Sequence, residues 1–200
     1  IGISNATNSV EEGLLYISEV IYLNENWSMI VFAENCSMLK KNGVLNLGAD
    51  SRAFAYSKNN DDLQKSFDDK FRENLKTKIK ETKKFKLIFL SPAFLKNGWL
   101  PEKINSEKII EINDFKLKLI YALSERPHKI GGFDMFKKIP KPMYNLLPAG
   151  SIYYFKFLDS VDDKKIDMLF DSLFLKNFND IDENFDANKL GFGLTILGGF

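Results

Sequence analysis

The sequence has almost none of the two side chains that most often carry metal ions and nucleophilic chemistry. Cys36 is the only cysteine and His128 the only histidine among 200 residues. A single cysteine forms no disulfide framework or thiolate metal site within the chain, and its scarcity fits a reducing cytoplasm. A Ser-His-Asp or Cys-His arrangement would have to include His128, which no known signature surrounds. The remaining possible metal ligands are carboxylates, which are spread along the chain as solvated faces and helix caps. We therefore expect no catalytic residue, no metal and no cofactor.

Long apolar runs and a strong charge of one sign are also missing. No run approaches the roughly 20 apolar residues that cross a bilayer, and no signal peptide is visible. The 28 basic and 27 acidic residues give a net charge of +1. This balance argues against a free-standing basic nucleic-acid binder, but it allows a subunit that contributes one local surface to an assembly. The chain opens on IGISNATN without methionine, so we expect it to be a fragment.

The closing stretch NKLGFGLTILGGF is rich in glycine but lacks the spacing of a nucleotide-binding loop. A dinucleotide fingerprint needs G-x-G-x-x-G between a strand and a helix, and a Walker loop needs Gly-Lys-Ser/Thr. Two interpretations stay open. The glycines supply the positive φ angles of a hairpin, or their amide N–H groups meet a polynucleotide backbone at the end of a sheet.

Strand patterns dominate the first third of the chain. Residues 13–35 form two β-rich runs around Asn24, Glu25 and Asn26, which predicts a long antiparallel hairpin. Residues 43–58 predict a strand interrupted by Gly48, where a bulge or a close backbone approach is expected.

A charged helix is predicted next, over residues 59–84, with Asp61 or Asp62 as its N-cap. Its apolar stripe recurs every four residues and comprises Leu63, Phe67, Phe71, Leu75 and Ile79. A second stripe holds Arg72, Lys76 and Lys80, and it is either a phosphate-facing row or a solvated helix face.

The rest of the chain alternates strands with loops and one more helix. Strands are predicted to end at Pro92 and Pro127, and another covers residues 151–158. Residues 128–151 predict a long ordered loop, anchored by Phe133, Met135, Phe136 and Tyr144. The second helix should bury Ile166, Leu169, Phe170, Leu173 and Phe174. This order predicts an α+β fold in which helices cover one face of antiparallel sheets, with an ending compatible with half of a ferredoxin-like unit.

Five blocks in a fixed order carry a family resemblance. They are EEGLLYISEVIYL, LNLGADSRAFAY, LIFLSPAFLKNGWLP, GGFDMFKKIPKPMYNLLPAGSIYYF and KLGFGLTILGGF. Together they resemble the family that forms the third subunit of the Cmr complex, a RAMP protein of type III-B CRISPR effectors. The resemblance runs through nearly the whole chain, and it implies that the chain is the C-terminal portion of such a protein.

The resemblance implies a RAMP fold of two ferredoxin-like (RRM-like) halves with long insertions. Residues 1–57 would complete the N-terminal half, residues 58–84 would be a charged helical insertion, and residues 85–200 would form the C-terminal half with a glycine-rich loop. It also implies a non-catalytic role in the cytoplasm. The subunit would sit beside the large polymerase-like subunit and other RAMP subunits and help to hold the 5′ tag of the CRISPR guide RNA.

The same resemblance assigns candidate RNA-binding residues. Residues 47–52 bring Gly48 and Arg52, and the arginine is the natural partner for a phosphate or a base. Residues 132–151 place lysines close to glycine turns, and the glycine-rich loop falls on the C-terminus. The full set is Gly48, Arg52, Lys137, Lys138, Lys141, Gly191, Gly193, Gly198 and Gly199.

Two other functions remain open at this point. Some RAMP proteins cleave repeat RNA, so a guide-processing endoribonuclease would need an acid and a base drawn from His128, tyrosines and lysines. A pure protein-interaction subunit, with RNA held by its neighbours, is supported by the near-neutral charge.

Overall fold

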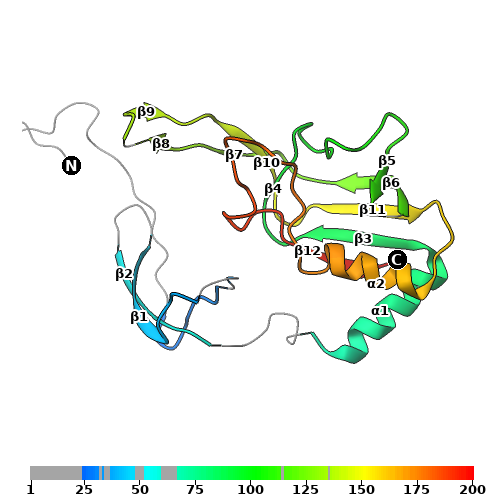
Figure 1. Ribbon diagram of the computed structural model, residues 1–200, viewed down its shortest axis with the longest axis horizontal. Helices are drawn as coiled ribbons and strands as arrows, with labels where there is room; N and C mark the ends of the chain where they lie inside the picture. The colour runs from blue at the N-terminus through cyan, green and yellow to red at the C-terminus, as the bar shows by residue number, and fades with distance from the viewer. Residues whose placement is uncertain are drawn as a thin grey trace, which may run out of the picture. The chain divides into compact units, whose positions relative to one another are not determined.

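The computed structural model describes residues 24–31, 33, 37–47, 52–59, 67–113, 115–134 and 136–200. The chain divides into two compact units, Ile1–Asn59 and Asn60–Phe200 (Figure 1). The described residues form antiparallel sheets and two helices, which confirms the predicted α+β class. Helix α1 belongs to the same unit as the largest sheet, and the expected domain boundaries after residues 57 and 84 stay predictions.

In the described part of the first unit, β1 (Asn42–Leu47) and β2 (Arg52–Ser57) form an antiparallel hairpin. The prediction of one interrupted strand over residues 43–58 is therefore wrong. The predicted turn near Asn24 is present, since the Trp27 N–H donates to the Asn24 carbonyl at 3.0 Å and Asn26 has a φ of 67°. Residues 27–31 form no strand, so the prediction of a long hairpin is wrong on that side. The other predicted arm, and Gly48, lie outside the described residues.

The second unit is built on a five-stranded sheet in the order β12-β3-β11-β6-β5. Its strands are β3 (Lys84–Phe89), β5 (Ile109–Ile112), β6 (Phe115–Leu123), β11 (Ile152–Phe157) and β12 (Thr195–Gly199). All four pairings are antiparallel. The connection from β3 to β6 contains β4 (Ala93–Phe94) and β5, and residues 90–113 hold no helix.

The core lies on one face of this sheet because its strands alternate buried and outward-facing residues. Strand β3 buries Phe85, Leu87 and Phe89, and β11 buries Tyr153 and Phe155. Stacked and edge-on rings fill this layer, with 5.5 Å between the ring centroids of Phe85 and Phe155. Buried residues of both helices join the same cluster. The helices therefore cover one face of the sheet, as predicted.

Helix α1 (Asp69–Thr82) begins later than the sequence suggested. Its N-cap is Asp68, whose carboxylate accepts the Lys70 N–H at 3.1 Å, so the prediction of Asp61 or Asp62 as the cap is wrong. Of the predicted stripe, Leu75 and Ile79 are buried, and Phe67 packs on the core from just before the helix. Phe71 is 47% exposed, so its predicted place in the apolar stripe is wrong, and Leu63 lies outside the described residues.

Helix α2 (Asp163–Leu173) begins where the sequence predicts but ends five residues before the predicted end at residue 178. Asp162 caps it by accepting the Lys165 N–H at 2.8 Å. Its predicted face is buried, namely Ile166, Leu169, Phe170, Leu173 and Phe174. Neither helix in the described part of the chain is long and apolar enough to span a membrane.

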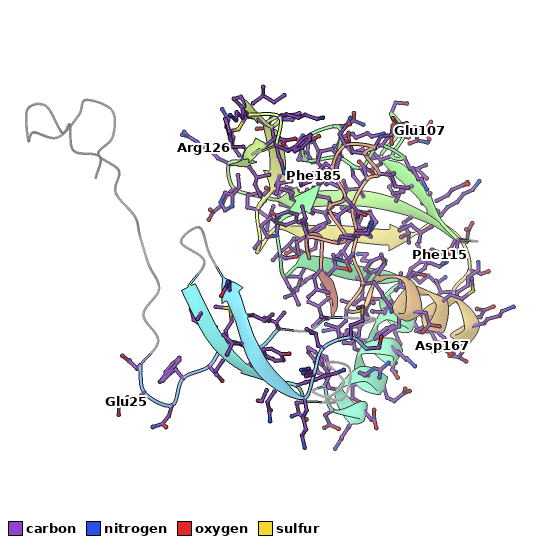
Figure 2. The ribbon with its side chains drawn as sticks, turned by 60° about the vertical axis from the view of Figure 1, so that its left-hand side comes forward. Glu25, Glu107, Phe115, Arg126, Asp167 and Phe185 are labelled. Carbon is purple, nitrogen blue, oxygen red and sulfur yellow. The ribbon has the colours of Figure 1, made fainter. Side chains whose placement is uncertain are left out.

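The cationic stripe of α1 faces α2. Lys76 Nζ lies 2.9 Å from Asp167 Oδ1, and Lys80 Nζ lies 2.6 Å from Asp163 Oδ1. Figure 2 labels Asp167 on α2. The Arg72 guanidinium lies 5.6 Å from the centroid of the Phe174 ring. The stripe therefore pairs with α2 and is not a row of free cations facing a phosphate, whereas the Lys80 side chain is 44% exposed and lies on a partly solvated helix face.

Residues 128–151, predicted as a loop, contain four short strands. Strands β7 (His128–Ile130) and β10 (Tyr144–Leu147) pair in the order β4-β10-β7, and β8 (Phe133–Asp134) pairs with β9 (Ile139–Pro140). Tyr144 is an anchor as predicted, since its ring stacks on Phe185 with 4.3 Å between centroids. Phe136 is 95% exposed and anchors nothing, and Phe133 is half-exposed. Met135 lies outside the described residues.

Candidate nucleic-acid interface

Three turns from distant parts of the sequence meet at one end of β3. We call residues 90–92, 148–151 and 191–194 the turn cluster. The Leu90 N–H donates to the Leu194 carbonyl at 2.7 Å, and the Gly150 N–H donates to the Phe89 carbonyl at 2.7 Å. Three of the five sequence blocks, those containing SPAF, PAGS and GFG, are thereby brought side by side.

Ser91 joins two of these turns through its hydroxyl group. Ser91 Oγ donates to the Gly191 carbonyl at 2.9 Å and accepts the Leu194 N–H at 2.9 Å. The Gly193 N–H donates to the Pro92 carbonyl at 2.6 Å. The turn between 191 and 194 is therefore held by the segment that follows β3.

The glycines of this turn adopt the positive φ angles that its backbone requires. Gly193 has a φ of 76°, and a Cβ added there would lie 2.5 Å from the side-chain amide of Asn179. The amide N–H groups of Gly150, Gly191 and Gly193 all donate to protein carbonyls. An RNA phosphate at this turn would therefore have to displace an internal hydrogen bond or use other groups.

The glycine-rich terminus is neither one loop nor a local hairpin. Gly191 and Gly193 lie in the turn, whereas Gly198 and Gly199 lie in β12, opposite Lys86 and Phe85. Strand β12 pairs with β3, which is far away in the sequence. The positive φ angles that the hairpin interpretation requires are present at Gly191 and Gly193, but β12 pairs with β3 and not with a neighbouring strand. The assignment of Gly198 and Gly199 to a loop is wrong.

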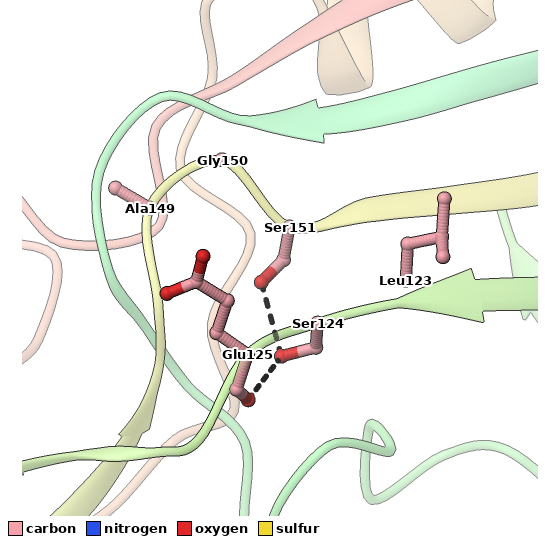
Figure 3. Close-up of a pocket in the computed structure, with 6 residues that line it drawn as sticks. All are labelled: Leu123, Ser124, Glu125, Ala149, Gly150 and Ser151. Carbon is pink, nitrogen blue, oxygen red and sulfur yellow. Dashed lines mark hydrogen bonds between the residues drawn. The ribbon is translucent and has the colours of Figure 1, made fainter.

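A pocket of about 270 Å³ opens beside the turn cluster (Figure 3). It is lined by Leu123, Ser124, Glu125, Ala149, Gly150 and Ser151. Ser151 Oγ lies 2.7 Å from the Pro148 carbonyl oxygen and 3.2 Å from Ser124 Oγ. The Glu125 carboxylate lies on the side of the Ala149–Gly150 turn (Figure 3). A carboxylate with hydroxyl groups accepts hydrogen bonds, so the pocket suits an amino group of a nucleobase better than a phosphate.

The three candidate lysines lie together around the β8–β9 hairpin. Asp134 Oδ1 accepts the N–H groups of Phe136 and Lys137, both at 3.0 Å, and so shapes the connection between the strands. The Lys141 N–H donates to the Gly132 carbonyl at 2.8 Å. The side chains of Lys137, Lys138 and Lys141 are exposed and make no ion pair with the described residues. The hairpin is therefore a cationic projection that carries an exposed phenylalanine.

Acidic residues lie near the glycine turn. Residues 180–186 contain Asp180, Asp182, Glu183 and Asp186. Asp180 Oδ2 accepts backbone N–H groups of Lys96 at 2.9 Å and Glu102 at 2.8 Å. Burial, with a smaller contribution from Asp182, raises the pKa of the Tyr144 phenol. The charge here disfavours a phosphate, in contrast to the β8–β9 hairpin.

Two further candidates are not among the residues of the turn cluster. Arg52 begins β2 in the first unit, and its side chain lies outside the described part of the structure. His128 is exposed on β7, and its ring makes no hydrogen bond with a described residue. A search of the described ranges finds no group of three histidine, cysteine, aspartate or glutamate side chains that would hold a metal ion.

Sequence reasoning missed the side chains that join the turns. Ser91 and Asn179 each bond to segments more than 80 residues away. No local pattern marks such a residue, because serine and asparagine are also common in ordinary turns.

No curated protein matches the chain. A family model described as CRISPR-associated protein (Cas_Cmr3) matches residues 1–199. Because this match covers nearly the whole sequence, the chain belongs to the Cmr3 family of CRISPR-associated proteins, the RAMP subunits of the type III-B Cmr complex.

Proposed function

We propose that this chain is a non-catalytic scaffold subunit that helps to hold the 5′ tag of the guide RNA beside the large polymerase-like subunit. The β8–β9 hairpin is the observation that carries the proposal. Lys137, Lys138 and Lys141 supply charge for phosphates, and Phe136, at 95% exposure, supplies a ring for a base. The pocket at the turn cluster supplies hydrogen-bond acceptors for a base edge.

We further propose that the five-stranded sheet is a variant of the ferredoxin-like fold. Taken in chain order, β3, β6, β11 and β12 are the four strands, with the first between the third and the fourth. Helix α2 connects the third and fourth strands, as that fold requires. The variant feature is α1, which precedes β3 instead of connecting it to β6.

Crosslinking in the assembled Cmr complex tests the RNA contact. A guide RNA with a photoreactive tag should crosslink to peptides within residues 132–151, 191–199 or 47–52. Replacing Lys137, Lys138 and Lys141 by glutamine should reduce the yield, whereas the same change at the exposed Lys70, Lys103 and Lys164 should not. Tag crosslinks found only on other subunits would refute the proposal.

A protein-contact role has separate support in the β1–β2 hairpin. Val44 is 65% exposed, and Leu45 and Phe54 are also exposed on this two-stranded element. An isolated hairpin is marginally stable in water, so a neighbouring surface would stabilise it. Replacing Val44 and Phe54 by serine should weaken assembly with the large subunit and leave RNA crosslinks on residues 132–151 in place.

A further inference from the structure

The face of the five-stranded sheet opposite the helices carries a row of lysines. Residues between the buried positions of β3, β11 and β6 point away from the core. The register places Lys84 opposite Lys156, and Lys156 opposite Lys118. Lys86 lies one step along β3 from this row. Four cations from three adjacent strands are thus gathered on one surface.

Three aromatic rings cross the same face next to these lysines. The centroids of Tyr121 and Tyr154 lie 6.2 Å apart, and those of Tyr154 and Phe200 lie 5.0 Å apart. Lys84 Nζ is 5.7 Å from the Phe200 ring centroid, and Lys86 Nζ is 5.7 Å from that of Tyr154. Tyr121 is 58% exposed. The rings form a continuous strip, bordered by cations and open to solvent at one end.

The charge of this face is not neutralised by its own residues. Among the described outward positions of the paired strands, Glu111 is the one carboxylate, and it pairs with Lys116 at 3.2 Å on the edge strand. The described residues offer no ion-pair partner to Lys84, Lys86, Lys118 and Lys156. Because these lysines form no ion pair within the described part of the protein, their charge can attract an anionic partner that lies across the strands.

We propose that this sheet face binds a segment of single-stranded RNA, whose bases stack on Tyr121, Tyr154 and Phe200 and whose phosphates meet the lysines. Stacking requires unpaired bases, so a duplex would satisfy the lysines but not the rings. The strip ends at an aliphatic row made by Ile88, Ile152 and Ile196, which limits its length.

This surface goes beyond the proposed tag contact and does not depend on it. Gly198, a candidate RNA contact from the sequence, belongs here, since it lies opposite Lys86 on β12. A Cβ at Gly198 would make ordinary contacts with Ile88 Cδ1 at 3.6 Å and Lys86 Cβ at 3.7 Å. The fold therefore does not require a glycine at this position, and the missing side chain leaves space beside the three rings.

Fluorescence anisotropy of the full chain with an oligouridylate of about 12 nucleotides tests the proposal. Tyr154→Ala should weaken binding by about 10-fold, and Tyr154→Phe should bind like the wild type because it keeps the ring. Lys86→Gln should lower the slope of log affinity against log salt by about 0.7, the contribution of one phosphate contact. The matched control Lys164→Gln, on α2, should change neither quantity. A duplex of the same length should bind more weakly than the single strand.

Equal binding by the wild type, Tyr154→Ala and Lys86→Gln would overturn the proposal, and so would an unchanged salt slope. Circular dichroism of each variant separates loss of binding from loss of folding, and Lys86→Gln changes no buried residue. Lysine labelling in the assembled complex distinguishes a protein occupant. Protection of Lys84 and Lys156 that appears only when guide RNA is added supports the proposal, whereas protection in the RNA-free complex contradicts it.

The experiments distinguish an error in the sheet-face proposal from an error in the proposed tag contact. Crosslinks of the tag to residues 132–151 would persist if only the sheet face were wrong. Oligouridylate binding that is sensitive to Tyr154→Ala would persist if only the tag contact were wrong.

Discussion

Replacing Gly193 by alanine should destabilise the second unit more than the same change at Gly191. Both glycines have φ angles near 77°, where a side chain costs about 1–2 kcal/mol. Alanine also restricts the unfolded chain, which returns about 0.4–1 kcal/mol at either position. A Cβ at Gly191 has no heavy atom within 4 Å, so Gly191→Ala measures the backbone term by itself.

The extra cost at Gly193 comes from Asn179. An added Cβ would lie 2.5 Å from both polar atoms of the Asn179 amide and would force that side chain to rotate. Asn179 Oδ1 accepts the Phe94 N–H at 2.8 Å, and Phe94 is 7% exposed, so this largely buried N–H loses its acceptor when the amide moves. The Phe192 carbonyl keeps a donor, since Asn177 Nδ2 lies 2.6 Å from it. Leaving the Phe94 N–H unpaired costs about 1–3 kcal/mol.

Urea unfolding of the single and double variants measures this excess. Gly193→Ala should therefore lower the free energy of unfolding by about 1–3 kcal/mol more than Gly191→Ala. In an Asn179→Ala background the clash is absent, so Gly193→Ala should cost no more than the backbone term. Equal effects of the two glycine changes, or additivity of Gly193→Ala and Asn179→Ala within about 0.5 kcal/mol, would refute the reasoning.

Further predictions concern the core and the ionisable groups of the second unit. Phe155→Ala should lower the free energy of unfolding by about 3–5 kcal/mol, because the ring is fully buried, whereas the half-exposed Phe71→Ala should cost about 0.5 kcal/mol or less in the same urea titration. The hydrogen bond to Asp167 raises the pKa of Lys76, so this pair stabilises the fold fully below the ordinary lysine pKa of 10.5 and less as pH rises through the raised value. Lys76→Gln should remove that pH dependence. It should lower the free energy of unfolding by under about 1 kcal/mol at neutral pH, since Asp167 is 59% exposed. A variant whose stability changes with alkaline pH as in the wild type would contradict this prediction. Burial raises the pKa of the Tyr153 phenol, which donates to the Trp99 carbonyl, so Tyr153 should stay protonated while the protein is folded. In an ultraviolet titration, Tyr153→Phe should therefore form as much tyrosinate as the wild type until the protein unfolds.

Local patterns predicted the parts of the fold that depend on neighbouring residues. The spacing of Ile166, Leu169 and Leu173 determines the buried face of α2, because a helix brings residues three or four apart onto one side. The start of α1 was misjudged because acidic residues occur at 61, 62 and 68, and each is an acceptable N-cap by sequence.

The pairing of strands that are distant in the sequence could not be predicted from local patterns. Nothing near Gly198 indicates that its strand pairs with β3, since the partner lies in a different block of the chain. The family resemblance combined a turn and a strand into one glycine-rich loop. One local signal was overlooked. Lysine alternates with apolar residues at Lys84, Lys86, Lys116 and Lys118, which places the cations on one face of their strands.

The position of β3 has a consequence for folding during synthesis. Both of its partners, β11 and β12, are translated after it, and roughly 100 residues separate β3 from β12. At about 5–20 residues per second, the ribosome leaves this highly apolar strand with an unpaired edge for about 5–20 s. Such an edge is a template for aggregation, so this subunit should depend on chaperones, or on co-translational binding of a partner, more than a protein whose interior strands pair with their neighbours in the sequence.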